Sequence, residues 1–246
     1  MKIVAMIPAR YDSERLPGKL MMYLGGIPII LRTYQNVISS GLFDEVFVIT
    51  DSEIIYNLIN KNGGNVFMSS VKHDNGSDRI AEFASKINSD LILNVQGDEP
   101  FIDKSSLEKL ISVFIDDDKK NIDLASLMQL ITNETDVLSP NNVKVVVDKN
   151  NFAIYFSRSV IPFNRSKDKN IKHFKHIGVY AFRKESLLYY YKSKSTTLEK
   201  LEKLEQLRFL ENGKKIKMVQ TDYKGHGIDV MEDLINARKI IDAKIS

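Results

Sequence analysis

Residues 3–19 of this chain read IVAMIPARYDSERLPGK, and they indicate the fold more strongly than any other stretch. The apolar run Ile3–Ile7 predicts a buried strand, and the polar residues after it predict a loop at the carboxyl end of that strand. This loop carries three cations, Arg10, Arg15 and Lys19. Arginine and lysine both favour phosphate oxygens, and ligands of open α/β sheets bind beyond the carboxyl ends of the strands. The loop therefore predicts a polyphosphate site.

A solvated basic loop is the alternative, and it explains any one of the three cations equally well. Three cations within ten residues repel one another unless an anion neutralises them, which favours an anion site for the set. The loop is not a Walker P-loop, because Leu20 follows Gly18-Lys19 and no glycine stands at the required place upstream. The chain also lacks a G-x-G-x-x-G motif, which disfavours a dinucleotide cofactor.

Strand and helix patterns alternate along the first half of the chain. Further strands are predicted at 45–50, 65–68 and 90–95. Helices are predicted at 27–40, 53–60, 79–87 and 105–115. Such alternation predicts an α/β fold with a mostly parallel sheet and helices on both faces.

The pattern changes after about residue 120. Strands are predicted at 143–147, 152–156 and 177–182 with little helix between them, and Lys149-Asn150-Asn151 is a turn signal. We expect antiparallel strands that extend the sheet and form an insertion in contact with a partner subunit. The basic, polar segment Arg165–Lys175 predicts a mobile loop.

A helix is predicted to begin at Thr196, where Thr196 and Glu199 have the spacing of a capping box. Leucines then recur at every third position from Leu198 to Leu210. Such a row drifts by about 60° per step around a helix, so we expect its apolar surface to wrap and to pack between two surfaces. A plain amphipathic helix capped by Gly213 is the alternative.

Composition limits the class of protein. The 246 residues suffice for one domain with a sizeable insertion, and the net charge of +3 disfavours a nucleic-acid binder. The absence of cysteine excludes disulfides and thiolate chemistry. Because the chain shows neither a signal peptide nor an apolar run long enough to span a bilayer, we expect a cytoplasmic protein without membrane insertion.

Two aspartates follow strand-like segments and are candidate metal ligands. Asp98 lies in Asn94–Pro100, and Asp229 precedes a predicted helix at 232–243. Carboxylates together with substrate phosphates are the ligands that Mg²⁺ prefers. A helix cap is the alternative for each, and from the sequence alone it is the better account of Asp229. Two such aspartates and a basic loop together predict metal-assisted phosphoryl or nucleotidyl transfer.

The segment Asn75–Arg79 predicts a turn that leads into a helix. Its backbone amides and Ser77 are candidate nucleotide contacts, and Arg79 is a candidate for a base or ribose contact. An ordinary helix cap explains the segment equally well. None of the histidines has a metal-ligand spacing such as H-E-x-x-H, and a lone histidine such as His176 is more often structural than catalytic.

Five separated motifs resemble those of the 3-deoxy-D-manno-octulosonate (Kdo) cytidylyltransferases, and they occur in that family's order along essentially the whole chain. The motifs are Ile7–Lys19, Asn94–Pro100, Tyr155–Arg158, His176–Tyr180 and Leu204–Arg208. The resemblance implies a single Rossmann-like α/β nucleotidyltransferase domain over residues 1–246, with a dimerisation and sugar-binding insertion at about 135–212. It also implies a homodimer that joins CMP from CTP to the anomeric hydroxyl of Kdo, releases pyrophosphate and activates the sugar for lipopolysaccharide biosynthesis.

The resemblance also implies a role for individual residues. The nucleotide would be bound by Ala9, Arg10, Ser13, Arg15, Lys19, Ser77 and Arg79. The sugar acid would be bound by Gln96, Arg158, His176, Tyr180, Glu205 and Gln206. Asp98 and Asp229 would hold Mg²⁺, and the catalytic residues would be Arg10, Lys19 and Asp98. No general base is evident.

The chain departs from the family pattern in places, and the stretch Asp78-Arg79-Ile80 also varies among members of that family. It has Val230-Met231 where the family more often has Thr-Pro after the aspartate, and Leu20 where a proline is usual. Three other functions stay open: the same chemistry on 8-amino-Kdo or a sialic-type acid, a nucleotide-binding subunit without activity, and a nucleic-acid module that uses Arg165–Lys175. Intact Arg10, Lys19, Asp98 and Asp229 disfavour the second, and the small net charge disfavours the third.

Overall fold

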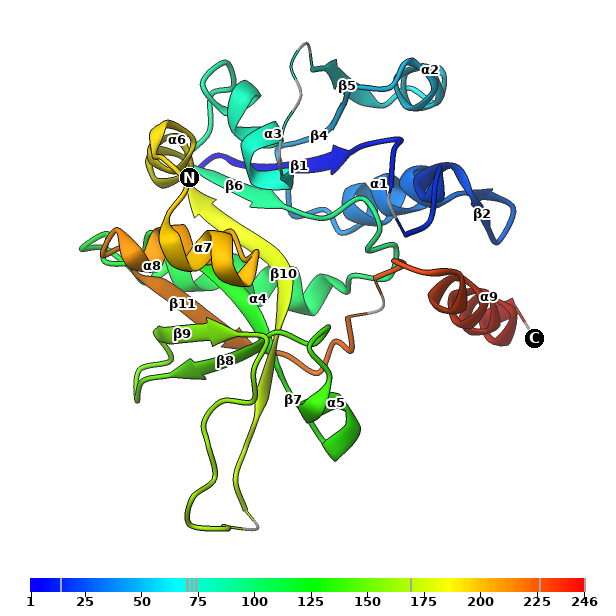
Figure 1. Cartoon of the computed structure of the whole chain (residues 1–246). Coiled ribbons are helices and arrows are strands. Elements are labelled where there is room, and N and C mark those ends of the chain that lie inside the picture. Colours follow the sequence, from blue (N-terminus) through cyan, green and yellow to red (C-terminus); the bar gives the residue numbers. More distant parts are fainter. Residues whose placement is uncertain are drawn as a thin grey trace. The chain divides into compact units, whose positions relative to one another are not determined.

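A computed structural model gives the structure of the chain (Figure 1) and describes residues 1–13, 15–69, 71, 73, 75–168, 170–225 and 227–245. The chain divides into two compact units, Met1–Leu107 with Gly225–Ser246 and Glu108–Lys224. No helix in the described ranges combines the length and the apolar character that crossing a bilayer requires.

The first unit has a sheet of parallel strands. Its order is β6 (Leu91–Asn94), β1 (Ile3–Ala9), β4 (Glu45–Thr50) and β5 (Asn65–Met68). The residues of β1 from Val4 to Ile7 are fully buried, as are all four residues of β6. Continuous apolar runs suit strands that are covered on both faces, which is why these strands were predictable. The predicted α/β class with mainly parallel strands is confirmed.

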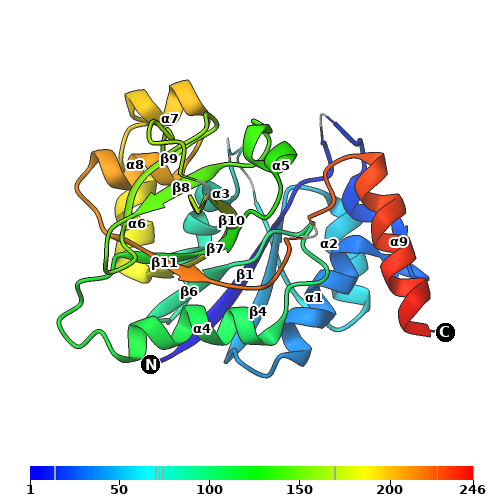
Figure 2. The ribbon, with the colours of Figure 1, turned by 90° about the horizontal axis from the view of Figure 1, so that it is seen from below.

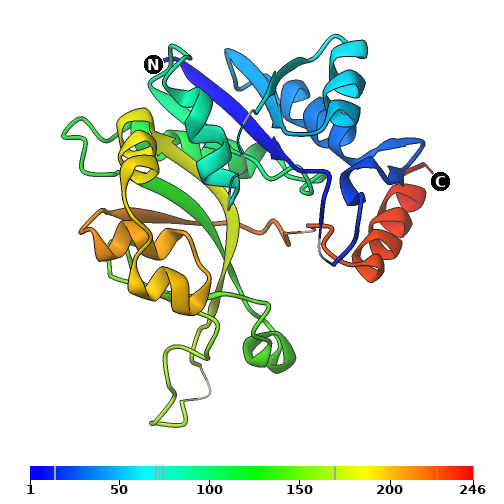
Figure 3. The ribbon, with the colours of Figure 1, turned by 45° about the horizontal axis from the view of Figure 1, so that its top comes forward.

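Helices connect and flank these strands. They are α1 (Ile29–Ser39), α2 (Glu53–Lys61), α3 (Gly76–Ala84) and α9 (Met231–Ile245). Helix α4 (Lys104–Ile115) begins in this unit and ends in the second. The short elements η1 (Lys19–Met21), β2 (Tyr23–Leu24) and β3 (Ile27–Pro28) follow the basic loop. Helix α9 lies beside β2 in Figures 1 and 3, and Arg238 Nη2 donates a hydrogen bond of 3.2 Å to the Tyr23 carbonyl.

Helix α3 begins three residues earlier than the sequence pattern predicts. The side chain of Asn75 accepts a hydrogen bond of 2.8 Å from the Asp78 amide and so caps the helix. Asparagine is among the best N-cap residues, and its side chain satisfies an amide that has no partner within the helix. The helix-cap alternative for Asn75–Arg79 is therefore confirmed, and Ser77 and Arg79 lie within the first turn of α3.

The second unit is built on five further strands. They are β7 (Leu124–Leu130), β8 (Lys144–Val147), β9 (Ala153–Ser157), β10 (Phe174–Arg183) and β11 (Ile216–Gln220). Strand β10 is antiparallel to β7 and β8, β8 is antiparallel to β9, and β11 is parallel to β7 (Figure 2). The three predicted antiparallel strands are confirmed, whereas the sequence pattern missed β7 and β11. Two short helices belong to the connections between these strands: α5 (Glu134–Leu138) lies between β7 and β8, and α6 (Lys184–Lys192) follows β10.

The predicted loop Arg165–Lys175 ends earlier than expected. Phe174 and Lys175 already belong to β10, where they pair with β7 and with β8. The rest of the predicted loop belongs to the connection between β9 and β10, which extends away from the strands in Figure 3.

The single leucine-rich helix predicted from Thr196 is wrong. The capping box is present, but the helix stops after α7 (Thr197–Glu202) and a second helix, α8 (Gln206–Glu211), follows. Between them Lys203 has φ 52°. Leucines at every third position cannot all face one surface of a straight helix, and the break leaves Leu201 77% exposed while Leu204 and Leu207 are buried.

Candidate functional site

A cavity of about 540 Å³ in the first unit lies where β1 and β6 end. Nine of the predicted site residues line it: Ala9, Arg10, Ser13, Arg15, Lys19, Arg79, Gln96, Asp98 and Asp229. The sequence pattern placed these residues after different strands and at the two ends of the chain. Parallel strands end at the same edge of a sheet, and this is why the fold brings them together.

Two glycines allow the loops around this cavity to fold as they do. Gly18 has φ +67°, a conformation that favours glycine, and the turn it forms places Lys19 at the start of η1. A Cβ atom at Gly97 would lie 3.0 Å from the Pro8 carbonyl oxygen. Glycine lets the loop after β6 pass this close to the end of β1 without displacing the Pro8 carbonyl. The short distance between these two loops brings the cationic and acidic residues to one cavity.

The C-terminal segment reaches the same cavity through one backbone hydrogen bond. The Ile228 amide donates to the Asp98 carbonyl at 3.0 Å, and the Ile228 side chain is fully buried. Gly227 lies against Glu99, since a Cβ atom there would come within 2.9 Å of Glu99 Oε1. These contacts hold Asp229 beside Asp98 although the two residues are far apart in the sequence.

The carboxylates at the cavity neutralise two of the three loop cations. Lys19 Nζ lies 2.5 Å from Asp98 Oδ2 and 3.4 Å from Asp229 Oδ1, and Arg15 forms an ion pair with Asp229. Within the described ranges Arg10 has no ion pair and is exposed. The chain itself therefore supplies anions for Arg15 and Lys19, so repulsion among the loop cations does not by itself require a polyphosphate.

Asp98 and Asp229 fit a magnesium ion that is shared with a substrate. Both carboxylates already converge on one cation, the Lys19 ammonium group. The described ranges contain no group of three or more His, Cys, Asp or Glu side chains suited to a metal ion. Magnesium commonly takes only one or two protein carboxylates and fills its remaining positions with water and substrate phosphates. At the start of α9, Asp233 accepts from the Asp229 and Val230 amides, so Asp229 keeps its carboxylate for the cavity.

Arg79 presents an unused donor at the cavity. Its side chain is buried, and its Nη2 donates 2.7 Å to Asp51 Oδ2. Among the described residues its Nη1 has no hydrogen-bond partner although it is buried. Ser77, by contrast, is not one of the residues that line the cavity, and its hydroxyl accepts from Asn94 Nδ2 at 3.3 Å. Ser77 therefore reaches the cavity only through Asn94, whose Oδ1 accepts a hydrogen bond of 3.2 Å from the Gln96 side chain that lines it.

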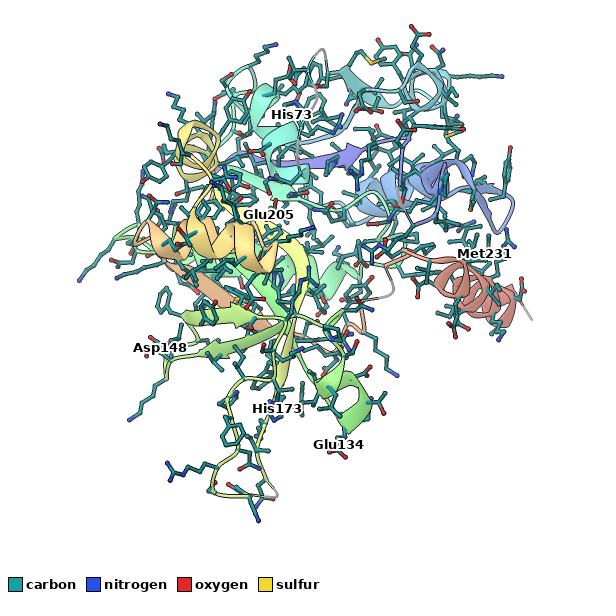
Figure 4. All side chains as sticks on the ribbon, viewed as in Figure 1. His73, Glu134, Asp148, His173, Glu205 and Met231 are labelled. Carbon is teal, nitrogen blue, oxygen red and sulfur yellow. The ribbon has the colours of Figure 1, made fainter. Side chains whose placement is uncertain are left out.

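His73 lines the cavity, although the sequence patterns gave it no role (Figure 4). Its Nε2 lies 2.8 Å from Glu82 Oε2 and 3.1 Å from Ser69 Oγ. Burial raises the pKa of Glu82, but its hydrogen bonds to Ser69 and His73 outweigh burial and hold that pKa below its usual value. In the sequence, the position of His73 two residues before the Asn75 cap was the only indication that it lies near the cavity.

Three predicted sugar-binding residues come together in the second unit. Tyr180 Oη donates 3.3 Å to Gln206 Oε1, and Gln206 Nε2 lies 3.4 Å from His176 Nδ1. The rings of His176 and Tyr180 have centroids 5.4 Å apart. Burial, together with the charge and hydrogen bond of Glu205, raises the pKa of Tyr180 well above its usual value. Glu205 itself lies at the junction of α7 and α8 (Figure 4).

Backbone carbonyls hold the guanidinium group of Arg158. Its Nε donates 2.9 Å to the Glu202 carbonyl and its Nη1 donates 3.0 Å to the Pro140 carbonyl. The carbonyl of Arg158 accepts from Lys144 Nζ, which also donates to the carbonyls of Ser139 and Asn142. Burial lowers the pKa of Lys144, and the charge of Arg158 lowers it further. Lys144 was missed because its β8 pattern only predicted a strand.

His176 is expected to make the fold less stable below pH 6.5. Although the residue keeps some exposed surface, the protein packed around its ring lowers the pKa to about 3, so the ring stays neutral in the folded chain. The unfolded chain binds a proton below about pH 6.5 that the folded chain does not bind, so stability is complete above that pH and falls as the pH drops toward 3. Between pH 7.5 and 5.5, the free energy of unfolding should fall by about 1 kcal/mol more in the wild type than in His176→Gln. Urea unfolding of both proteins measures this difference, and equal losses would contradict a depressed pKa.

Comparisons with known proteins show which proteins this chain is similar to. A family model described as cytidylyltransferase matches residues 4–216. A 3-deoxy-manno-octulosonate cytidylyltransferase of Flavobacterium johnsoniae is 56% identical over 98% of this chain and 99% of its own length. The protein of the same name from Christiangramia forsetii is 51% identical over 98% of this chain and 97% of its own length.

Two solved structures show the same architecture at different levels of similarity. A CMP:2-keto-3-deoxy-manno-octonic acid synthetase complexed with CTP superimposes with a TM-score of 0.94 at 34% identity, covering 99% of this chain and all of its own. A 4-diphosphocytidyl-2C-methyl-D-erythritol synthase of Anaerococcus prevotii has a TM-score of 0.64 at 18% identity over 98% of each chain. The second likeness shows the fold alone.

Proposed function

Since the chain belongs to the 3-deoxy-manno-octulosonate cytidylyltransferases, we propose that it transfers CMP from CTP to the anomeric hydroxyl of Kdo and releases pyrophosphate. The observation that carries this proposal is the cavity at the ends of β1 and β6, where the cations of the loop meet Asp98 and Asp229. A similar chain that superimposes over nearly its full length is complexed with CTP.

The loop after β1 would bind the triphosphate of CTP. Arg10 is exposed at the cavity and has no ion pair among the described residues, so it is available for phosphate oxygens. Lys19 and Arg15 would exchange part of their contact with Asp98 and Asp229 for the phosphates. Preorganised cations of this kind stabilise the charge that develops on the α-phosphate and on the departing pyrophosphate. Arg79, with its unused Nη1 donor, would contact the nucleoside part.

Magnesium is the cofactor that we propose for this site. Asp98 and Asp229 would hold the ion together with phosphate oxygens of CTP. When bound, Mg²⁺ supplies Lewis-acid stabilisation of the phosphate charge and lowers the pKa of a neighbouring hydroxyl. The Lys19 ammonium contacts both carboxylates, which keeps two aspartates together at one cavity.

The second unit would bind the sugar acid. The guanidinium of Arg158 suits a sugar carboxylate, since its planar fork of donors matches two carboxylate oxygens. His176, Tyr180 and Gln206 supply neutral polar groups, and Glu205 adds a carboxylate next to Tyr180. Buried polar partners of this kind reject sugars that lack the matching hydroxyl.

Pyrophosphate release tests the proposed reaction. With CTP and Mg²⁺ present, release should depend on added Kdo, and 8-amino-Kdo and a sialic acid serve as competing substrates. Release with one of those sugars alone would keep the chemistry and change the substrate. Folded protein that binds CTP but releases no pyrophosphate with any sugar would contradict the proposal and favour a nucleotide-binding subunit without activity.

A homodimer in the cytoplasm is the assembly and location that we propose. Two large apolar side chains of the second unit, Phe163 and Ile154, are 84% and 61% exposed. Phe163 lies in the connection between β9 and β10, and Ile154 lies on β9. Coverage by a second subunit would remove both side chains from water. Light scattering that gives the mass of one chain would contradict the dimer.

A further inference from the structure

Ser126 is a fully buried residue of β7 that lies opposite an irregularity in β10. Regular pairing of the two strands is interrupted between Ile177 and Tyr180, so that Gly178 and Val179 are extra residues on β10. Ser126 Oγ lies 3.1 Å from the Ile177 carbonyl oxygen and 2.9 Å from the Val179 carbonyl oxygen. Such bulges are frequent next to active sites, where they redirect side chains.

The same hydroxyl contacts His176, and the carbonyls decide the direction of that contact. Ser126 Oγ lies 2.8 Å from His176 Nε2. Carbonyl oxygens can only accept, and two of them face the single proton of the Ser126 hydroxyl, so we infer that this proton points to the Ile177 and Val179 carbonyls. The hydroxyl must then accept from His176, which requires the proton of the ring to be on Nε2.

This proton position determines the polarity of the next two contacts. The pKa of His176 is about 3, so the ring is neutral at physiological pH and Nδ1 is an acceptor. Nδ1 therefore accepts from the side-chain amide of Gln206, 3.4 Å away. With its nitrogen toward His176, Gln206 presents Oε1 to the Tyr180 hydroxyl at 3.3 Å. With the ring proton on Nε2, reversing the Gln206 amide would place its Oε1 against the Nδ1 acceptor.

We propose that Ser126 is a positioning residue of the sugar site, which fixes the ring tautomer of His176 and, through it, the orientation of the Gln206 amide. The inference rests on the proposed function, because the sugar is the ligand that His176, Tyr180 and Gln206 would bind. A sugar hydroxyl then meets a fixed pattern of donors and acceptors. Ser126 itself is fully buried and acts on the sugar only through His176.

Ser126→Ala tests this role, with Ser186→Ala as the matched control. Alanine has nearly the volume of serine and removes only the hydroxyl. Ser186 is another buried serine of the second unit, and its hydroxyl donates 3.1 Å to Asp123 Oδ1. We expect Ser126→Ala to raise the sugar KM about tenfold, the effect of one lost hydrogen bond, and to leave the CTP KM within about twofold. Ser186→Ala should leave both constants within about twofold of wild type.

Nitrogen-15 NMR of the histidine rings gives a second readout that a merely structural role would not change. The wild type should show His176 with the proton on Nε2, assigned by comparison with His176→Gln, and Ser126→Ala should show a mixture of both tautomers. A wild-type ring protonated on Nδ1 would overturn the proposal without any variant. An unchanged tautomer in Ser126→Ala, or equal increases in both KM values, would also overturn it. If no sugar supports turnover in the wild type, the proposed function fails, and the tautomer comparison still decides the role of Ser126.

Discussion

Replacing Asp98 with asparagine is expected to lower kcat at least about a hundredfold while the fold stays intact. Asparagine keeps the size of the side chain but removes the negative charge that faces Lys19 at 2.5 Å. A magnesium ion at this position would lose a charged ligand, and the stabilisation of charge on the transferring phosphate would fall with it. Steady-state turnover at saturating CTP and Kdo, over a range of Mg²⁺ concentrations, measures the effect.

Asp90→Asn is the matched control for this substitution. Asp90 precedes β6, whereas Asp98 follows it. The Asp90 carboxylate accepts a hydrogen bond of 2.6 Å from the Lys2 amide. The control should keep kcat within about twofold of wild type, because surface substitutions away from a site rarely change more than local stability. If Asp98→Asn turned over at a near-wild-type rate at every Mg²⁺ concentration, the metal assignment would be wrong.

Replacing Arg158 with alanine is expected to raise the KM for the sugar about a hundredfold, with little change in the KM for CTP. Charge-assisted hydrogen bonds contribute about 1.5–3 kcal/mol each, and about 2.7 kcal/mol corresponds to a hundredfold change. The guanidinium group is held in place by the Glu202 and Pro140 carbonyls, so it requires little further ordering when a carboxylate binds. Measuring both KM values on the same preparation separates the two substrates.

Two further variants make this test specific. Arg158→Lys keeps the charge but lacks the planar fork, so its sugar KM should lie between those of wild type and Arg158→Ala. Arg165→Ala removes an exposed arginine from the same unit and should leave both constants unchanged. Equal increases in the KM values for sugar and CTP in Arg158→Ala would show that Arg158 does not recognise the sugar.

Local patterns predicted the first unit well. Strands β4 and β5 have the predicted bounds, and β1 and β6 differ from the prediction by at most two residues at an end. Buried parallel strands are short apolar runs between turn signals, so each can be recognised without its neighbours. The second unit was predicted less completely, because β11 is half-exposed at its end and its pairing with β7 depends on a partner far away in the sequence.

The leucine-rich stretch shows where a local pattern misleads. Its capping box depends on four consecutive residues and was predicted correctly. The break at Lys203 was not, because the burial of Leu204 and Leu207 depends on the surface on which α8 packs. Contacts between α8 and β9 join residues about fifty positions apart, and no local pattern contains them.

Short stretches of sequence predicted the parallel strands of the first unit, the basic loop after β1 and the carboxylate of Asp98 after β6, since each depends on a few neighbouring residues. The strand-like segment expected before Asp229 was wrong, because the described residues between β11 and α9 form no strand. That Asp229 and Asp98 share Lys19 follows from the folded chain, in which the Ile228 amide donates a hydrogen bond to the Asp98 carbonyl. The tertiary structure also decided that Ser126 faces the irregularity of β10. That contact depends on the register between β7 and β10, two antiparallel strands whose paired residues are about fifty positions apart in the sequence. No single residue sets this register.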